Sequence, residues 1–256
     1  MEHPGKIQSV DNAFEIVDFI REEEAVNLTA IADHVGLSES TAHYYLASLD
    51  SNNIVRREGN QYTLGYKLLE YGGIVKARNE LYNDAKQHMD RIAMQTDLAV
   101  YLGIEDQKQV VHIAAIEIED TSIIGDHDGK RTDFHSTALG KAILAYLPEE
   151  KIETILSWID YPAFTDKTIT DPEDLRSYLD TVVKQGYAIN DEEDYRGWKG
   201  IAVPLLSDTG VEGALSVAGP KSKMDHQQDN IIRLLQEATD EIELKVSSNE
   251  KPTQKG

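Results

Sequence analysis

Two acidic segments and one stretch of small residues contain the residue types that could do chemistry in this chain. The first segment is Asp126-His127-Asp128, followed by His135, and these are side chains that metal ions bind. The loop is bounded by glycine, and no second cluster at ligand spacing accompanies it, so solvated loop charges explain it better. We therefore predict no metal site and no other cofactor.

The second acidic segment, Asp191-Glu192-Glu193-Asp194, offers adjacent carboxylates of the kind used in general acid–base catalysis. A run of four charges is more often a solvated turn, and neither a nucleophile nor a glycine-rich phosphate loop accompanies it. The chain has no cysteine, which excludes disulfides, iron–sulfur clusters and thiol catalysis. We predict that the protein is not an enzyme; an enzyme would need a turnover that depends on this run.

The third stretch is His-Ser-Thr-Ala-Leu-Gly-Lys-Ala at residues 135–142, where small side chains begin a predicted helix. Small side chains leave the N–H groups of the first turn accessible, and a helix N-terminus can bind a carboxylate or a similar anion. Close packing of the helix on a sheet would require the same small residues. Taken alone, the stretch is compatible with both explanations.

The elements before residue 52 have the order of a helix-turn-helix. Apolar residues at helical spacing predict a first helix from Ser9, its N-cap, to about Glu24. Thr29 is the predicted cap of a second helix, Gly36 supplies a turn with positive φ, and Ser38 caps a third helix. Two helices joined by a tight glycine turn are the helix-turn-helix layout. The predicted stripe of the first helix consists of Val10, Ala13, Phe14, Val17, Asp18 and Ile20.

A predicted β-hairpin completes the N-terminal domain. Residues 54–57 and 61–64 have the pattern of short strands on either side of Glu58-Gly59-Asn60. Three helices followed by such a hairpin form a winged helix. Small helical units also mediate protein contacts, but the order of these elements favours binding to DNA. We predict that the winged helix-turn-helix domain spans residues 1–66.

The pattern after the hairpin predicts a linker and a second domain. A short helical piece at 67–71 is expected to end at Gly72-Gly73, before a longer helix from Ile74 to about Gln95. A helix between domains can connect them, mediate dimer formation, or do both. The predicted division is a linker helix at 67–78, a second domain at 79–248 and a disordered tail at 249–256.

The second domain alternates strands and helices. This pattern indicates an α+β fold with one sheet and helices on its faces. The predicted strands are 98–104, 109–116, 121–125, 186–190, 200–206 and 213–217, and the predicted helices are 137–147, 149–156, 171–185 and 225–246.

The chain is strongly acidic, with 46 acidic and 25 basic residues and a formal charge of −21. This charge argues against a surface that holds nucleic acid through bulk charge alone. One explanation is a cytoplasm with molar salt, where the Debye length is about 3 Å and self-repulsion is weak; the alternative is an ordinary acidic protein. No apolar run approaches the roughly 18 residues of a membrane span, and the N-terminus does not have the pattern of a signal peptide. We predict a cytoplasmic protein without a membrane partner.

Several short motifs occur along the chain in a characteristic order and spacing. These motifs are Gly36–His43, Tyr62–Gly65, His135–Ala142, Gly186-Tyr187, Asp191-Glu192-Glu193, Gly197, Ile201–Pro204 and Leu215–Pro220. In that order and spacing, the chain resembles the IclR family of transcriptional regulators over nearly its whole length.

The resemblance implies a winged-helix DNA-binding domain, a linker helix and a GAF-like effector-binding domain. It implies homodimers or tetramers on palindromic operators, a small organic, aromatic or sugar-derived acid as the effector, and no catalysis. The chain is therefore expected to be a DNA-binding repressor or activator of transcription. The alternative is a GAF-like ligand sensor whose acidic winged helix mediates protein contacts rather than DNA binding.

In the family, the effector lies over the sheet, held by amides at the start of the helix in 135–142 and by side chains that follow Gly186-Tyr187. By resemblance, Ala138 and Leu139 would supply these amides, and Asn190 stands where relatives can use an acidic side chain. Gly200 stands where a cysteine is common, and Trp198 replaces a smaller apolar residue. The remaining predicted effector contacts are Ile124, Thr132 and Ala202.

The predicted DNA-reading helix also departs from the family pattern. A basic residue often follows the histidine that corresponds to His43, and here that residue is Tyr44. Phosphate contacts are therefore expected from Arg56 and Arg57 near the wing, while polar side chains of the helix read bases. At molar salt, shape and polar contacts must supply more of the affinity. The predicted DNA contacts are Thr29, Ser38, Glu39, Ser40, Thr41, His43, Tyr44, Arg56 and Arg57.

Overall fold

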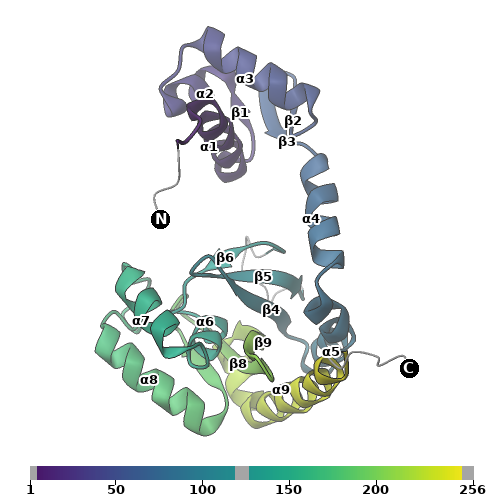
Figure 1. Ribbon diagram of the computed structural model, residues 1–256, viewed down its shortest axis with the longest axis vertical. Coiled ribbons are helices and arrows are strands. Elements are labelled where there is room, and N and C mark those ends of the chain that lie inside the picture. The colour runs from purple at the N-terminus through teal and green to yellow at the C-terminus, as the bar shows by residue number, and fades with distance from the viewer. Residues whose placement is uncertain (1–4, 119–126, 250–256) are drawn as a thin grey trace, which may run out of the picture. The chain divides into compact units, whose positions relative to one another are not determined.

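The computed structural model describes residues 5–118 and 127–249 of the 256-residue chain. The chain folds into two compact units, Met1–Val75 and Lys76–Gly256, whose elements are labelled in Figure 1. Within the described ranges, no helix combines the length and the apolar character needed to cross a bilayer. The predicted strand at 121–125 lies outside the described residues.

The N-terminal unit is a winged helix-turn-helix, as predicted. Its three helices pack on a small antiparallel sheet with the strand order β1-β3-β2. The two-residue strand β1 was not predicted, and it pairs with β3. Its elements are α1 (Gln8–Glu23), β1 (Val26–Asn27), α2 (Leu28–Val35), α3 (Glu39–Ser51), β2 (Val55–Glu58) and β3 (Gln61–Leu64). The core contains Ile16, Ile20, Val26, Ile31, Leu46, Val55 and Tyr62.

Two of the predicted helix caps are wrong and two are confirmed. The backbone of Ile7, without a side-chain hydrogen bond, precedes α1, so Ser9 lies inside the helix. Asn27 caps α2, because its Oδ1 accepts from Ala30 N at 3.0 Å, and Thr29 is therefore a helical residue. Gly36 has the expected left-handed conformation with φ of 69°, and Ser38 Oγ accepts from Thr41 N at 3.2 Å.

The buried face of α1 also differs from the predicted stripe. Ile16 and Ile20 are buried with Asn12, whereas Phe14 remains 66% exposed. The burial of Asn12 has a structural reason, since its Nδ2 donates to Tyr45 Oη at 3.3 Å. This contact and the packing of α2 and α3 decide which face of α1 is buried. The apolar residues of α1 are therefore divided between a buried face and an exposed face.

The helix after the wing, α4 (Lys67–Ala77), continues through Gly72-Gly73. The predicted break at these glycines is wrong, because an internal glycine costs a helix only about 1 kcal/mol. The break occurs instead before α5 (Glu80–Thr96), where Asn79 Oδ1 accepts from Tyr82 N at 2.8 Å and caps the new helix.

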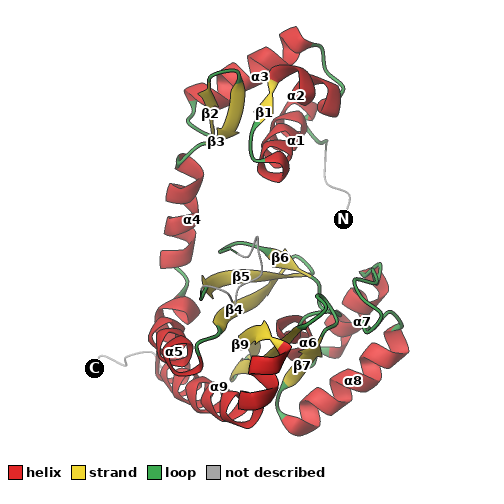
Figure 2. Ribbon diagram, turned by 180° about the vertical axis from the view of Figure 1, so that it is seen from behind, coloured by secondary structure: helices red, strands yellow, loops and turns green. Residues whose placement is uncertain are grey.

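The C-terminal unit is built on a curled antiparallel sheet with the strand order β6-β5-β4-β9-β8-β7. Helices cover both of its faces, as Figure 2 shows. The strands are β4 (Ala99–Asp106), β5 (Gln109–Ile116), β6 (Arg131–Thr132), β7 (Ala188–Asp191), β8 (Trp198–Ser207) and β9 (Gly210–Pro220). The helices besides α5 are α6 (Ala138–Leu144), α7 (Glu149–Trp158), α8 (Pro172–Gln185) and α9 (Lys221–Asn249).

Each face of this sheet has its own apolar core. Helices α5 and α9 pack on one face, with Met89, Ile92 and Leu235 fully or almost fully buried among strand residues. Helices α6, α7 and α8 contribute to the core on the other face. The predicted α+β arrangement is therefore confirmed, although α6 is shorter than predicted and α9 begins earlier and continues to Asn249.

Candidate functional site

A cavity of about 480 Å³ lies on the face of the sheet that α6 covers. All six strands contribute lining residues, so the cavity follows the sheet from one edge strand to the other. The lining residues on the strands are Arg131 and Thr132 (β6), His112 (β5), Tyr101 (β4), Ser216 and Ala218 (β9), Gly200 (β8) and Asn190 (β7). The others are Lys130, Asp133, Ser136, Thr137, Ala138, Leu139, Phe164, Asp194 and Tyr195.

The start of α6 forms one wall of the cavity. Thr137 caps the helix, since its Oγ1 accepts from Gly140 N at 3.0 Å and donates to the carbonyl of Asp133 at 2.9 Å. Ala138 and Leu139 occupy the first turn, where backbone amides have no carbonyl partner within the helix. Small side chains here also serve packing, because a Cβ on Gly140 would lie 2.5 Å from Phe134 Cα.

The turn between β7 and β8 forms the opposite wall. Asn190 is buried, and its Nδ2 donates to Asp194 Oδ1 at 2.6 Å, while its Oδ1 accepts from Glu193 N at 2.8 Å. Asp194 Oδ1 also accepts from Tyr195 N at 2.8 Å. Burial raises the pKa of the Asp194 carboxyl above its usual range, although these hydrogen bonds oppose the shift.

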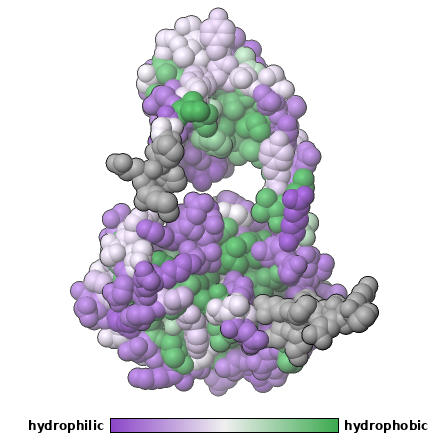
Figure 3. Space-filling view, viewed as in Figure 1, coloured by the Kyte–Doolittle hydropathy of each residue, from purple (hydrophilic) through white to green (hydrophobic). Residues whose placement is uncertain are grey.

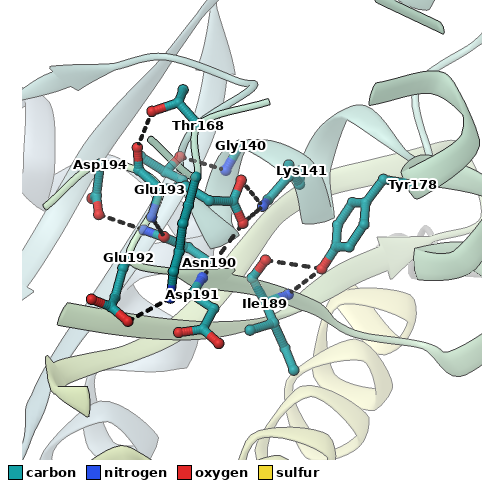
Figure 4. A network of polar contacts seen from close by, with 12 residues as sticks. Gly140, Lys141, Thr168, Tyr178, Ile189, Asn190, Asp191, Glu192, Glu193 and Asp194 are labelled. Atoms are coloured by element: carbon teal, nitrogen blue, oxygen red, sulfur yellow. Dashed lines mark hydrogen bonds and ion pairs between the residues drawn. The ribbon is translucent and has the colours of Figure 1, made fainter. Parts of the chain in front are cut away.

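A buried ion pair lies between these two walls (Figure 4). The Lys141 ammonium of α6 donates to both carboxylate oxygens of Glu193, at 2.5 Å for Oε2, and lies 4.5 Å from the ring centre of Tyr178. Burial lowers the pKa of Lys141 and raises that of Glu193, in each case against their mutual attraction. Burial also raises the pKa of Tyr178 to about 12.

The acidic run 191–194 is therefore only partly the solvated turn that was expected. Glu193 is buried with Lys141, and the Asp194 carboxylate accepts from Asn190. The two other carboxylates lie nearer the surface and form ion pairs. Asp191 pairs with Lys221, and Glu192 with Lys167 at 2.6 Å.

The loop between α7 and α8 adds an aromatic side chain to the cavity. Phe164 lines the cavity and stacks on His135, with ring centres 5.9 Å apart. His135 is fully buried, and its Nε2 lies 3.1 Å from the carbonyl of Pro162. Thr165 and Thr168 donate to the carbonyls of Glu192 and Glu193, which attaches this loop to the β7–β8 turn.

No metal site brings His135 together with the acidic loop in the part of the chain that the structure describes, where no group of three His, Cys, Asp or Glu side chains could hold an ion. Asp126 lies outside the described residues. The Asp128 carboxylate accepts from the backbone N–H of Ala115 at 2.9 Å and pairs with Lys76.

The predicted effector residues divide into three groups. Five of them line the cavity, namely Thr132, Ala138, Leu139, Asn190 and Gly200. Ala202 is fully buried in the core and Trp198 is half-buried, and the structure places neither among the lining residues. Ile124 lies outside the described residues.

Sequence reasoning missed several lining residues on the strands, above all Tyr101, His112 and Ser216. The alternation of side chains along a strand contained a usable signal, because residues two apart share a face. Ser216 and Ala218 illustrate this, and both line the cavity. The sequence pattern predicts these strands but not which of them are neighbours in the sheet, so the shared face could not be assembled.

The predicted DNA contacts are exposed on the N-terminal unit. Tyr44 of α3 is 76% exposed, and Ser40 and His43 are also exposed. Thr29 of α2 donates to Glu39 Oε1 at 2.6 Å, so these two predicted contacts bind each other across the turn. The remaining predicted residues, Ser38, Thr41, Arg56 and Arg57, are exposed as well.

The two wing arginines are held by neighbouring groups. Arg56 pairs with Glu58, donates to Thr63 Oγ1 at 3.2 Å and lies 4.8 Å from the ring centre of Tyr66. Arg57 donates to the carbonyl of Gly59 at 3.0 Å. These contacts orient both guanidinium groups, and Glu58 offsets part of the positive charge of the wing.

Two family models match the chain. The IclR helix-turn-helix domain matches residues 9–59, and the C-terminal domain of bacterial transcriptional regulators of the IclR type matches residues 75–244. Among curated proteins, the chain is 33% identical to the probable HTH-type transcriptional regulator ArcR of Halobacterium salinarum, over 96% of both chains. It is 29% identical to KdgR of Escherichia coli, over 98% of this chain and 97% of that one.

Solved structures have the same fold. The IclR structure of Thermotoga maritima is 31% identical, with a TM-score of 0.79 over 94% of this chain and 99% of that one. An IclR homologue of Microbacterium hydrocarbonoxydans, described as complexed with 4-hydroxybenzoate, is 24% identical, with a TM-score of 0.80 over 92% of this chain and 98% of that one.

Proposed function

The chain belongs to the IclR family of transcriptional regulators, and from that premise we propose that α3 reads an operator while the cavity of the C-terminal unit binds a small organic acid that controls DNA binding. Members of this family have a helix-turn-helix domain and a C-terminal effector-binding domain, and this chain matches both. The match favours a DNA-binding regulator over a ligand sensor that contacts only proteins. The cavity on the α6 face of the sheet is the observation that carries the effector part of the proposal.

The lining of the cavity suits an acid with polar substituents. The amides of Ala138 and Leu139 lie in the first turn of α6, where a carboxylate can accept hydrogen bonds. Ser216, Thr132 and Asn190 offer neutral polar groups, and Tyr101 and Phe164 offer aromatic surface. Gly200 adds no side chain, so the floor of the cavity stays open at β8. A related fold is described with an aromatic acid, 4-hydroxybenzoate.

The surface of α3 supports the proposal for DNA. Ser40, His43 and Tyr44 are exposed on one helix and can offer hydrogen bonds and apolar contacts to base edges. Arg56 and Arg57 extend the surface at the wing and would contact phosphates. Ser38 is committed to capping α3, so we assign it the positioning of the helix rather than a base contact.

We also propose that the protein is a homodimer through the exposed apolar residues of the N-terminal unit. Phe14 of α1 is 66% exposed, and Leu69 and Val75 of α4 are 73% and 71% exposed. Figure 3 shows apolar surface on this unit. Large exposed apolar side chains that gather on a surface are typical of interaction sites, and a two-fold dimer fits a palindromic operator. Sedimentation should show that Phe14→Glu with Leu69→Glu converts a dimer into a monomer.

We do not assign a catalytic activity, since the relatives are named as transcriptional regulators. The acidic run 191–194 was the candidate for acid–base chemistry. Three of its carboxylates, those of Asp191, Glu192 and Glu193, form ion pairs with lysines. The net charge of −21 and a relative from Halobacterium support the proposal that the chain is adapted to high salt.

Two measurements test the proposed function. A mobility-shift assay with the chain's own upstream DNA, in molar KCl, should show a specific complex, and its absence would contradict the DNA part. A thermal-shift screen of sugar acids, keto acids and aromatic acids should show a stabilising acid, because a ligand at 100 times its Kd stabilises by about 2.7 kcal/mol. That acid should also change the mobility shift.

A further inference from the structure

Asp194 lies at the end of the cavity beside the β7–β8 turn. Its carboxylate faces the cavity, whereas the carboxylates of Asp191, Glu192 and Glu193 are paired with lysines. Glu193 and Asp194 are consecutive, yet their side chains diverge, with Glu193 directed to Lys141 and Asp194 to Asn190 (Figure 4). Asp194 lines the cavity, whereas Glu193 does not. The buried ion pair therefore leaves the charge of Asp194 for the cavity.

The hydrogen bonds of Asp194 fix its orientation but do not use all of its acceptor capacity. Asn190 Nδ2 and Tyr195 N both donate to Oδ1, at 2.6 and 2.8 Å. Among the described residues, Oδ2 accepts no hydrogen bond from a neighbouring residue. A carboxylate can accept about four hydrogen bonds, so Asp194 is held in place with one oxygen available to a ligand.

The position of Asp194 carries an energetic cost in the absence of such a ligand. Burial raises the pKa of this carboxyl, which means that its surroundings disfavour the charged form. A hydrogen bond to a charged acceptor is worth more than one to a neutral acceptor, and more still where water is displaced. A hydroxyl donor on the ligand would therefore gain a charge-assisted hydrogen bond at Oδ2.

We infer that Asp194 is a specificity-determining residue that accepts a hydrogen bond from a hydroxyl group of the effector, so that the protein selects hydroxylated acids over unsubstituted acids of the same skeleton. The inference rests on the proposed function, because it requires the acid to bind in this cavity. It assigns the hydroxyl group of the effector to the β7–β8 turn, where Asn190 holds Asp194 in position.

The neutral polar groups around the cavity suit a neutral donor. Thr132, Asn190 and Ser216 line it from the strands and are uncharged. Of the basic lining residues, Arg131 is paired with Asp106 at 2.6 Å, so its charge is already matched. A hydroxyl group can donate to Asp194 and share hydrogen bonds with the neutral groups, and 4-aminobutyrate tests the ammonium alternative.

The test is a set of matched acids titrated calorimetrically into the full-length protein. The probes are 4-hydroxybutyrate, butyrate and 4-aminobutyrate, together with 4-hydroxybenzoate against benzoate and gluconate against hexanoate. In at least one pair, the wild type should bind the hydroxylated acid at least tenfold more tightly than its unsubstituted partner. This preference should fall below threefold in Asp194→Ala.

Two further variants keep the outcome interpretable. Asp194→Asn retains an oxygen for Asn190 and Tyr195, so it preserves the turn if Asp194→Ala does not fold, and its preference should lie between those of the wild type and Asp194→Ala. Asp191→Asn changes a neighbouring carboxylate that pairs with Lys221 outside the cavity lining, and it should bind like the wild type.

The results separate this inference from the proposed function. Tight binding of acids without a hydroxyl preference, or a preference that survives in both Asp194 variants, would overturn the inference alone. Preferential binding of 4-aminobutyrate would overturn the choice of a neutral donor. If no acid of any type bound, the proposed effector function would fail and the inference with it.

Discussion

Lys141 and Glu193 form a buried ion pair that joins α6 to the β7–β8 turn, the two elements that face each other across the cavity. Lys141 is fully buried, and Tyr178 lies beside its ammonium group. Removing two charges from water costs several kcal/mol per ion, which the mutual attraction barely offsets. The pair therefore adds little net stability, but it fixes the separation of the two walls.

Replacing one member of this pair should be far more harmful than replacing both. In Lys141→Met, the Glu193 carboxylate would be left buried without its partner, and the free energy of unfolding should fall by about 3–5 kcal/mol. Urea denaturation followed by circular dichroism measures this change.

The double variant Lys141→Met with Glu193→Leu is the matched control. Because it removes both charges, it should recover most of the lost stability. Effector affinity should remain reduced even in the double variant if the pair positions the walls. A double variant as unstable as Lys141→Met would contradict this view of the pair.

Asp194→Asn should stabilise the ligand-free protein at neutral pH. Burial raises the pKa of Asp194, so the folded protein binds this proton more tightly than the unfolded chain does. Its contribution to stability is therefore present below the unfolded pKa of about 4 and is lost as pH rises through the raised folded pKa. The amide that replaces the carboxyl group has no such proton to lose. The free energy of unfolding, measured between pH 4 and 7, should fall less steeply in the variant; parallel curves would contradict the prediction.

The helices and strands that could be predicted from the sequence are those whose pattern is local. Gly36 and Ser38 mark the turn and the start of α3 by their own conformation and capping, and both functions are present. The Asp171-Pro172 start of α8 is equally local, since Asp171 accepts from two backbone amides of the first turn. Such signals need no knowledge of the tertiary structure.

The errors arise where tertiary contacts decide. Asn12 is buried because Tyr45, far along the chain, accepts its hydrogen bond, so no pattern within α1 reveals the buried face. The cavity likewise joins His112 and Ser216, whose strands lie on either side of β4. The sequence indicates both strands but not this strand order.

Gly200→Ala should narrow the cavity without disturbing the fold. A Cβ at this position would lie 3.4 Å from Ala138 Cβ and 3.7 Å from Ala218 Cβ, which is ordinary van der Waals contact. We expect an unchanged melting temperature and about tenfold weaker binding of ring-sized acids, because one added methyl group in a pocket is worth about 1–3 kcal/mol. Calorimetric titration with 4-hydroxybenzoate measures the affinity.

Gly140→Ala is the contrasting variant. Its Cβ would lie 2.5 Å from Phe134 Cα and 2.6 Å from the carbonyl oxygen of Asp133, both backbone atoms. This clash should destabilise the unit by roughly 1–3 kcal/mol or more. Equal stability of the two glycine variants would show that α6 does not pack as closely as the structure indicates.

Arg56→Ala with Arg57→Ala should weaken operator binding and reduce its salt dependence, since each lost phosphate contact lowers the slope of log K against log salt by about 0.9. The loss should be similar on specific and random DNA, because phosphate contacts carry no sequence information.

His43→Ala should instead reduce the preference for the operator and leave the slope unchanged, since His43 lies on α3 among the polar residues that face solvent. Fluorescence anisotropy from 0.1 to 2 M KCl measures both quantities. An unchanged slope in the double arginine variant would remove these residues from the DNA interface.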